Sequence, residues 1–371
     1  MGSPMTRVTV GDVERAVVRA FPADRAEGWD RIGLLAGDPL AEVTGVVLAL
    51  DPSPEAIDEA HRRGANVLVT HHPAFLDPVA PVRGAPGGGG TVFRALSKGV
   101  SLINAHTNLD RDPGAQRLIP SLLGLTPVAP IERSAQPCAV VTVYVPLKSA
   151  DEVADAMSGA GGGAVGRYQA CSFSCTGIGR FTADDGADPA VGVAGQPTNV
   201  EEVRLEMITS RPLSVRVVAA ARASHPYEEP LITVTEVLRS RNASALGMLC
   251  EASEGFTLAD LVGRAAAAFC VKPRVWGEAS SPIGRVACAT GSAGSLIHDA
   301  IAAGATALVA GEVRYHDATE ALERGLAVVE IGHDVSEWPL VGLLAQVVRG
   351  VAGIEPDRIY EMNASTAWWT P

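Results

Sequence analysis

The sequence has no apolar run that approaches the roughly 18 to 20 residues of a membrane-spanning helix. Its longer apolar stretches, such as residues 139–145, have the length of a strand instead. The N-terminus also lacks the basic and then apolar pattern of a secretory signal. We therefore expect a cytoplasmic protein that makes no contact with membranes.

Lysine is scarce: Lys98, Lys148 and Lys272 stand beside 27 arginines. The 30 basic residues face 42 Asp and Glu, which gives a net charge of −12. General binding to nucleic acid needs a stripe of basic side chains that neutralises phosphates, and no such stripe is visible. We therefore expect no general nucleic-acid binding.

Paired cysteines of the kind that build a structural zinc site are also missing. Cys171 and Cys175 have the spacing of half such a site, but no second pair completes it. The six cysteines are therefore expected to be reduced and buried. With 371 residues, of which 47% are hydrophobic and 19% charged, the chain is typical of a globular protein of two to three domains.

The region from residue 43 to residue 109 alternates strands with helices. Strands are predicted over 43–50, 66–70 and 100–103, and helices over 54–63 and 92–98. Each helix ends at a glycine, Gly64 or Gly99. Four consecutive glycines at 87–90 predict a mobile loop before the second helix. Such units favour a mainly parallel, doubly wound sheet, whose ligands gather beyond the carboxyl ends of its strands.

The C-terminal third repeats this plan. Residues 287–311 align without gaps on residues 47–71, and the alignment matches a helix, its stop glycine and the next strand. The following helix and strand lead to His106 in the first copy and to His333 in the second. We therefore predict two related three-layer α/β halves that form one core, with polar residues at the strand exits of both.

The middle of the chain has a different order of predicted strands and helices. Residues 139–145 predict a strand, and Ser149 with Glu152 forms a capping box that opens a helix ending near residue 158. Strand-like alternation at 168–181 is followed by a strand, a helix and a strand at 202–208, 212–223 and 231–237. The order βαβ–βαβ predicts a ferredoxin-like α+β domain inserted between the halves. The predicted domains are residues 1–130 and 239–371 for the two halves of the core, and 131–238 for the insert.

Four of the eight histidines lie at strand exits: His71, His72, His106 and His333. Asp110 follows His106 by four residues, and Glu337 follows His333 by four, so a helix from Asp334 onward would bring His333 near Glu337. Imidazole and carboxylate ligands without thiols suit zinc, iron, manganese or cobalt. At a strand exit two adjacent histidines can diverge, one toward each of two ions about 3.5 to 4 Å apart, as in two-metal hydrolases.

These residues resemble the Nif-three-like family of dinuclear metal-centre proteins, whose members are often labelled GTP cyclohydrolase 1 type 2 homologues. The resemblance rests on Trp29-Asp30, Val69-Thr-His-His-Pro73, Ala105-His-Thr-Asn-Leu-Asp110 and Gly332-His-Asp-Val-Ser-Glu337. It implies two divalent ions per chain (Zn, Fe, Mn or Co), with Glu337 bridging them and with these ligands: His71, His72, Asp110, His333 and Glu337. It also implies a homohexamer built from trimers. The middle segment, with Gly177-x-Gly179 and His225-Pro-Tyr-Glu-Glu229, resembles the PII-like insert of the longer members.

Three interpretations of the function remain open. The first is a metal-dependent hydrolase that acts on a nucleotide or related compound, with His106, Glu312 or His316 as the proton carrier. Candidate substrate-binding residues lie in a turn before a helix and in the insert: Gly291, Ser292, Gly294 and Ser295, and His225, Tyr227 and Glu228. The second is a regulatory module whose insert senses a small ligand. The third is a metal carrier without turnover.

Overall fold

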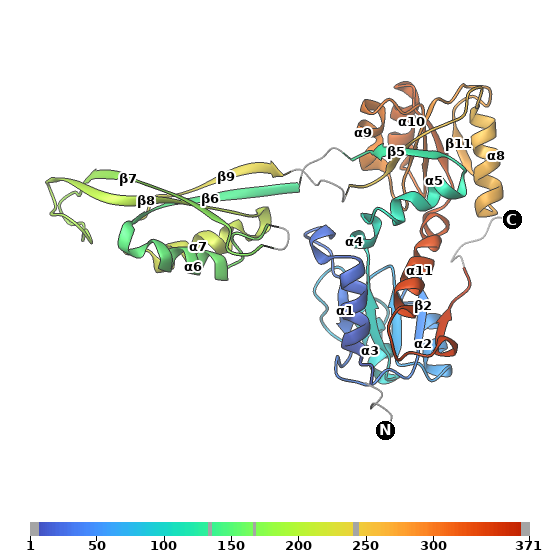
Figure 1. Ribbon diagram of the computed structural model, residues 1–371, viewed down its shortest axis with the longest axis horizontal. Coiled ribbons are helices and arrows are strands. Elements are labelled where there is room, and N and C mark those ends of the chain that lie inside the picture. The colour runs from blue at the N-terminus through green and yellow to red at the C-terminus, as the bar shows by residue number, and fades with distance from the viewer. Residues whose placement is uncertain (1–6, 133–135, 166–167, 240–244, 365–371) are drawn as a thin grey trace. The chain divides into compact units, whose positions relative to one another are not determined.

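The computed structural model describes residues 7–132, 136–165, 168–239 and 245–364. The chain divides into two compact units, one formed by Met1–Arg133 with Asn242–Pro371 and the other by Ser134–Arg241 (Figure 1). The predicted domain boundaries near 131 and 239 adjoin segments 133–135 and 240–244, which lie outside the described residues. Among the helices that the structure describes, none combines the length and apolarity needed to cross a membrane.

The first unit contains two mixed sheets. The N-terminal sheet has the order β1-β4-β3-β2-β15, in which only β1 is antiparallel to its neighbour. Its strands are β1 (Gly33–Ala36), β2 (Val46–Ala49), β3 (Val67–Thr70), β4 (Ser101–Asn104) and β15 (Ile359–Glu361). The strands β2, β3 and β4 are buried at every position, which is the pattern of a sheet covered on both faces.

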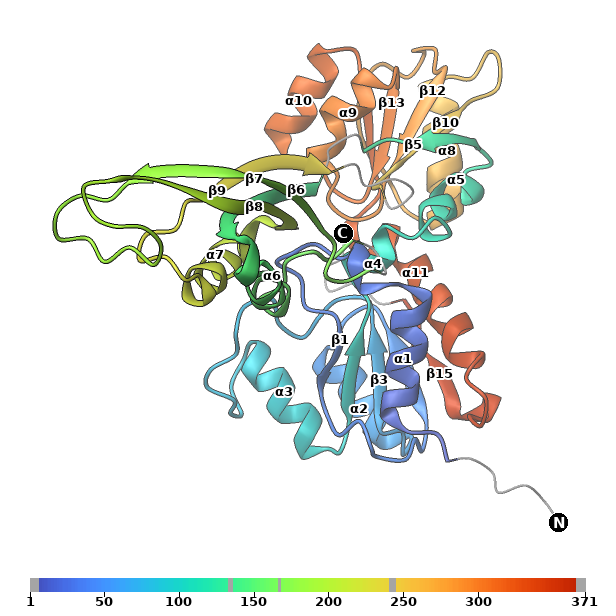
Figure 2. The same ribbon diagram turned by 60° about the vertical axis from the view of Figure 1, so that its left-hand side comes forward.

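Helices cover both faces of this sheet, as Figure 2 shows. Apolar side chains of α1 (Val10–Ala20) and α11 (His333–Arg349) form a core with one face. Those of α2 (Pro54–Arg62) and α3 (Gly88–Ser97) form a second core with the other face. The short helices α4 (Thr107–Asp110) and α5 (Leu118–Leu122) lead to the second sheet.

The second sheet repeats the arrangement of the first. Its order is β11-β14-β13-β12-β10-β5, with β12, β13 and β14 parallel. The strands are β5 (Thr126–Pro130), β10 (Met248–Glu251), β11 (Arg274–Trp276), β12 (Arg285–Cys288), β13 (Ala307–Ala310) and β14 (Ala327–Glu330). One face packs on α8 (Leu258–Phe269), and the other on α9 (Ile297–Ala302) and α10 (Tyr315–Glu323). The predicted repetition of strand and helix is confirmed.

Helix α11 links the two halves of this unit. Its first turns carry His333 and Glu337, while its apolar residues from Leu340 to Val348 lie in the core of the N-terminal sheet. The chain then adds β15 beside β2 in that same sheet. Two side chains of the predicted site are therefore held by a helix that the N-terminal half packs, although they come from the C-terminal third.

The second unit has the predicted order of elements. Its strands are β6 (Gln136–Pro146), β7 (Ser172–Thr182), β8 (Pro197–Ser210) and β9 (Ile232–Arg239), and its helices α6 (Ala150–Gly159) and α7 (Ser214–Ser224). All neighbours in the sheet order β7-β8-β6-β9 are antiparallel. Both helices pack on one face around Val141, Val143, Leu205 and Met207.

Three local predictions are wrong. Cys175 and Cys270 are exposed, although all six cysteines were expected to be buried. The glycines at 88–90 form the first turn of α3 rather than a mobile loop, because they allow a close approach of the chain: a Cβ on Gly90 would lie 1.5 Å from the carbonyl oxygen of Ala85. Ser149 makes no side-chain cap at α6, since a 3-10 turn over Leu147–Ser149 leads directly into the helix.

Candidate metal centre

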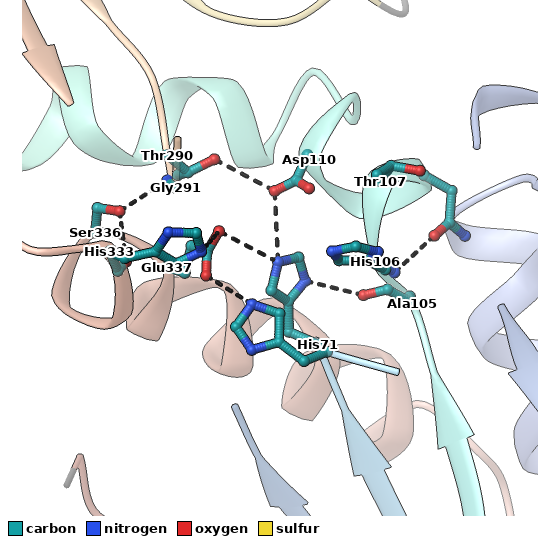
Figure 3. Close-up of polar contacts among 12 residues, drawn as sticks. His71, Ala105, His106, Thr107, Asp110, Thr290, Gly291, His333, Ser336 and Glu337 are labelled. Carbon is teal, nitrogen blue, oxygen red and sulfur yellow. Dashed lines mark hydrogen bonds and ion pairs between the residues drawn. The ribbon is translucent and has the colours of Figure 1, made fainter. Parts of the chain in front are cut away.

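The predicted histidines and carboxylates gather beyond the carboxyl ends of β3 and β4 (Figure 3). His71 and His72 follow β3, and His106 lies between β4 and α4, whose last residue is Asp110. His333 begins α11, so Glu337 lies one turn further along the same helix. The chain from Asp334 onward is therefore helical, which is the condition under which His333 and Glu337 lie near one another.

Three groups of side chains have ligand atoms that all lie within 4.8 Å of one another among the described residues. They are His71, Asp110 and Glu337; His72, His333 and Glu337; and His71, His72 and His106. The first two groups share Glu337. The carboxylate of Glu337 is therefore common to two groups of three possible ligands.

The distances place Glu337 at the centre. Its Oε2 lies 2.9 Å from Nε2 of His72, and its Oε1 lies 3.2 Å from Nε2 of His333. Nε2 of His71 lies 3.8 Å from Oε1 of Glu337 and 3.6 Å from Oδ1 of Asp110. The His71 side chain is fully buried, and the Glu337 side chain is only 6% exposed.

Each of the four histidines uses Nδ1 to contact an oxygen outside the cluster. These partners are the Ala105 carbonyl for His71, Asp51 for His72, Asp30 for His106 and Glu312 for His333, at 3.0, 2.7, 2.9 and 3.1 Å. Such outer partners fix the orientation and tautomer of metal-binding histidines. The four rings consequently direct Nε2 toward the interior of the cluster.

The donor set fits divalent metal. Nε2 of His71 is buried and has no hydrogen-bond partner among the described residues, and it faces carboxylate oxygens of Asp110 and Glu337 at 3.6 and 3.8 Å. A buried polar atom without a partner costs about 1 to 3 kcal/mol, so this nitrogen favours an occupant of the cluster. Imidazole nitrogens and carboxylate oxygens are the ligands that zinc, iron, manganese and cobalt accept.

Burial and the contacts within the cluster shift the pKa values of its side chains in opposite directions. Burial alone lowers the pKa of His72, but hydrogen bonds to Asp51 and Glu337 outweigh it and raise that pKa to about 10. The hydrogen bond to Glu337 likewise raises the pKa of His333 to about 9. Burial raises the pKa of Glu337, yet its histidine partners, His333 first, hold it far below the ordinary value. Without metal, the cluster thus balances its charge with protons.

Asp30 is a part of the site whose role the sequence did not reveal. Its buried carboxylate accepts hydrogen bonds from the backbone N–H of Thr107 at 3.0 Å and from the Thr107 hydroxyl, and it contacts His106. Burial raises its pKa, but the bonds to His106 and Thr107 dominate and lower it to about 2. The motif Trp29-Asp30 marked this residue, but only the fold shows that it reaches His106.

The predicted turn at 291–295 lies partly at the cluster. The N–H of Gly291 donates to the hydroxyl of Ser336 at 2.9 Å, and Thr290 donates to Asp110 at 3.3 Å. The N–H of Ala293 donates to the carbonyl of Glu312 at 3.2 Å, while Ser292 and Ser295 are exposed. Gly294 lies beside Asp317: a Cβ on the glycine would be 2.7 Å from Oδ2 of Asp317. A phosphate-binding role for this turn stays a prediction.

The remaining candidates lie elsewhere. His316 is exposed on α10 and belongs to none of the three ligand groups found in the described residues. In the second unit, Nε2 of His225 donates to the carbonyl of Tyr144 at 2.9 Å, and Nδ1 accepts from the N–H of Tyr227 at 3.1 Å. Both nitrogens of His225 therefore serve the local fold. Tyr227 and Glu228 line a pocket of that unit.

A cleft of about 1660 Å³ opens onto the cluster within the first unit. His72, His333 and Glu312 lie on its wall together with Lys272 and Trp338. No ion pair of Lys272 occurs in the part of the chain that the structure describes. The cluster is therefore open to a molecule of nucleotide size on the side of His72 and His333.

Comparison with known proteins gives consistent matches over nearly the whole chain. The family model described as Duf34/NIF3 (NGG1p interacting factor 3) matches residues 8–358. The GTP cyclohydrolase 1 type 2 homolog of Mycobacterium tuberculosis is 33% identical over 353 residues, 93% of each chain. A solved Bacillus cereus protein related to NIF3 is 28% identical with a TM-score of 0.63, covering 99% of this chain and 100% of the other. A Staphylococcus aureus structure is 25% identical with a TM-score of 0.64, covering 98% and 99%.

Proposed function

Because the chain belongs to the Duf34/NIF3 family, we propose that it binds two divalent metal ions and hydrolyses a nucleotide or related compound. One observation carries the proposal: two groups of three possible ligands share the buried carboxylate of Glu337. A shared carboxylate is what a pair of ions a few ångströms apart requires.

The proposed ligands follow from these groups. His71 and Asp110 would hold one ion and His72 and His333 the other, and the carboxylate of Glu337, which belongs to both groups, would serve both ions. His106 is a further candidate ligand, because its Nδ1 contacts Asp30 and a ligand atom of its ring lies within 4.8 Å of those of His71 and His72. Zinc, iron, manganese and cobalt all suit this mixture of nitrogen and oxygen donors.

When bound, a pair of divalent ions supplies an activated water and positive charge opposite a developing oxyanion. The chain itself orients the ligands through the four Nδ1 contacts and leaves the cleft open beside His72 and His333. This opening favours a catalyst over a metal carrier, because a storage site closes around its ion.

Glu312 is the proposed proton acceptor. Its side chain is 54% exposed, lines the cleft and lies 3.1 Å from Nδ1 of His333. A carboxylate at this place can take a proton from a reacting water and pass it to solvent. Glu312→Gln keeps an oxygen for His333 but removes the base.

The proposal extends to the assembly and to the second unit. We propose a homohexamer built from trimers, located in the cytoplasm, in which the second unit is a PII-like insert. Its βαββαβ order and its sheet order β7-β8-β6-β9 support a ferredoxin-like insert. Sedimentation velocity of the full chain measures the assembly directly.

The test is a turnover screen of metal-reconstituted protein over nucleotides and phosphoesters. We expect chelation to abolish turnover and added divalent metal to restore it. His106→Ala should lose metal, whereas Glu312→Gln should keep its metal and lose about a hundredfold or more in kcat. Metal-loaded protein that turns over none of these compounds would contradict the hydrolase, and a His106→Ala variant with full metal content would remove His106 from the ligand set.

A further inference from the structure

Two sequence motifs that the metal centre does not use meet in the second unit. Gly177 and Gly179 of the first motif, and Tyr227 and Glu228 of the second, line one pocket of about 820 Å³. Every residue that lines this pocket belongs to Ser134–Arg241. The volume lies within the range of sites for small organic ligands.

Aromatic and aliphatic side chains form the walls of the pocket. The rings of Phe181 and Tyr227 meet edge to face, with centroids 6.2 Å apart and planes inclined at 61°. Phe173 and Leu231 extend the apolar surface and are 66% and 60% exposed. Exposed rings beside a concave surface offer a face on which a flat ligand can stack.

A carboxylate lies at the end of this aromatic corner. The hydroxyl of Tyr227 donates to Oε1 of Glu202 at 2.9 Å. Gly177 lies opposite Glu202 in the β7–β8 ladder, and a Cβ on Gly179 would lie 2.1 Å from Oε2. Gly179 therefore leaves the space that the Glu202 carboxylate occupies, and a side chain at 179 would displace it.

Of the other five charged residues that line the pocket, three are engaged, while Arg180 and Asp188 form no ion pair within the described residues. Arg204 pairs with Glu206 at 2.6 Å, and Glu229 pairs with Arg222 at 3.3 Å. Glu228 accepts from the N–H of Asp188 at 3.2 Å. No ion pair of Glu202 occurs within the described residues. A carboxylate held by one phenol keeps lone pairs for further N–H donors and repels anions.

We propose that this pocket binds a flat nitrogen heterocycle without negative charge, which stacks on Tyr227, meets Phe181 with its edge and donates N–H groups to Glu202. A ring that presents two adjacent N–H donors matches a carboxylate best, and guanine is such a ring. The site is separate from the metal ligands, so it holds whether or not the metal centre turns over a substrate.

The test is equilibrium binding of guanosine, inosine and adenosine to the full-length protein by isothermal titration calorimetry. Guanosine offers two adjacent donors, inosine offers one, and adenosine lacks the ring N–H. We expect affinity to fall in that order, with about a tenfold loss from guanosine to adenosine. Titrations before and after chelation should agree, because no proposed metal ligand lines the pocket.

Glu202→Gln keeps the shape of the side chain but replaces an acceptor with an amide, so it should weaken guanosine binding about tenfold and abolish the preference over adenosine. Glu201→Gln is the matched control, since Glu201 is exposed on the same strand and does not line the pocket. Tyr227→Phe keeps the ring but removes the hydroxyl that holds Glu202 in place, so the affinity for guanosine should fall several-fold. Thermal unfolding checks that this variant is folded.

Three results would overturn the proposal. They are the absence of saturable guanosine binding, equal affinities for the wild type and a folded Glu202→Gln variant, and binding that disappears on chelation. A pocket filled by a second copy of the chain would give the first of these results.

Discussion

Gly291 lies so close to Glu337 that a Cβ on the glycine would stand 2.3 Å from Oε1. The same carboxylate oxygen lies 3.2 Å from Nε2 of His333. A side chain at 291 therefore takes the space that the carboxylate of Glu337, the proposed bridging ligand, occupies. We expect Gly291→Ala to lose most of its bound metal, as measured by elemental analysis of the purified, folded protein.

Gly325→Ala is the control for this substitution. Gly325 also has a positive φ, of 82° against 57° at Gly291, but a Cβ there would meet nothing within 4 Å. Both alanines carry the cost of a left-handed backbone, about 1 kcal/mol, and only the one at 291 displaces Glu337. Equal metal contents in the two variants would contradict the proposed place of Glu337.

The number of ions lost should distinguish the bridging ligand from a terminal one. Glu337 belongs to two ligand groups, whereas Asp110 and His106 each belong to one. We expect close to two ions per wild-type chain, about one in Asp110→Asn or His106→Ala, and fewer than one in Glu337→Gln. Glu323→Gln, an exposed position on α10, should leave the count unchanged. A wild-type protein with a single ion would rule out the dinuclear centre.

Asp30 should stabilise the fold in a pH-dependent way. Its pKa of about 2 in the folded state lies below the ordinary value of 3.8, so its contribution is complete above pH 3.8 and is lost as pH falls toward 2. The difference corresponds to about 2 kcal/mol. Urea unfolding of metal-free protein should show Asp30→Asn less stable by about that amount at pH 7, with a smaller gap at pH 3. Asp24→Asn, at an exposed position, should cost almost nothing.

Metal uptake should release protons. In metal-free protein the pKa of His72 is about 10 and that of His333 about 9, so both rings are protonated at pH 7. Metal binds neutral imidazole, and therefore apparent affinity should fall as pH falls. Calorimetry in buffers of different ionisation enthalpy should report more than one proton released per chain at pH 7. Uptake without proton release would show that the rings are already neutral.

Removal of the second unit should leave a folded, metal-binding core. Each apolar cluster of the described residues lies wholly within one unit, so deletion opens none of them. We expect a chain in which a short linker replaces Ser134–Val237 to bind as much metal per chain as the full protein. Insoluble or metal-free products with several different linkers would count against an inserted unit.

Local sequence patterns predicted much of the fold. Apolar runs that end at polar residues predicted β3 and β4, and the stop glycines Gly64 and Gly99 marked the ends of the helices before them. The strand exits then identified His71, His72 and His106 as neighbours, which the cluster confirms. These features are encoded within a few residues, so a single sequence displays them.

Contacts between distant segments were not predictable in the same way. The glycines at 88–90 looked flexible, because their tight contact with Ala85 exists only once the chain has turned back on itself. Asp30 and His106 are 76 residues apart, and nothing local indicates that their side chains meet. The course of α11 into the N-terminal core likewise depends on packing rather than on any pattern within the helix.

The position of α11 and β15 has a consequence for synthesis. The N-terminal half leaves the ribosome first, but its sheet receives β15, and its core receives Leu340 to Val348, only from the last part of the chain. At about 5 to 20 residues per second, the nascent strands β2 and β3 wait for many seconds with the face that α1 and α11 share only partly covered. During translation the first half therefore lacks part of its core until α11 has emerged, and the proposed ligands His333 and Glu337 join the cluster only then.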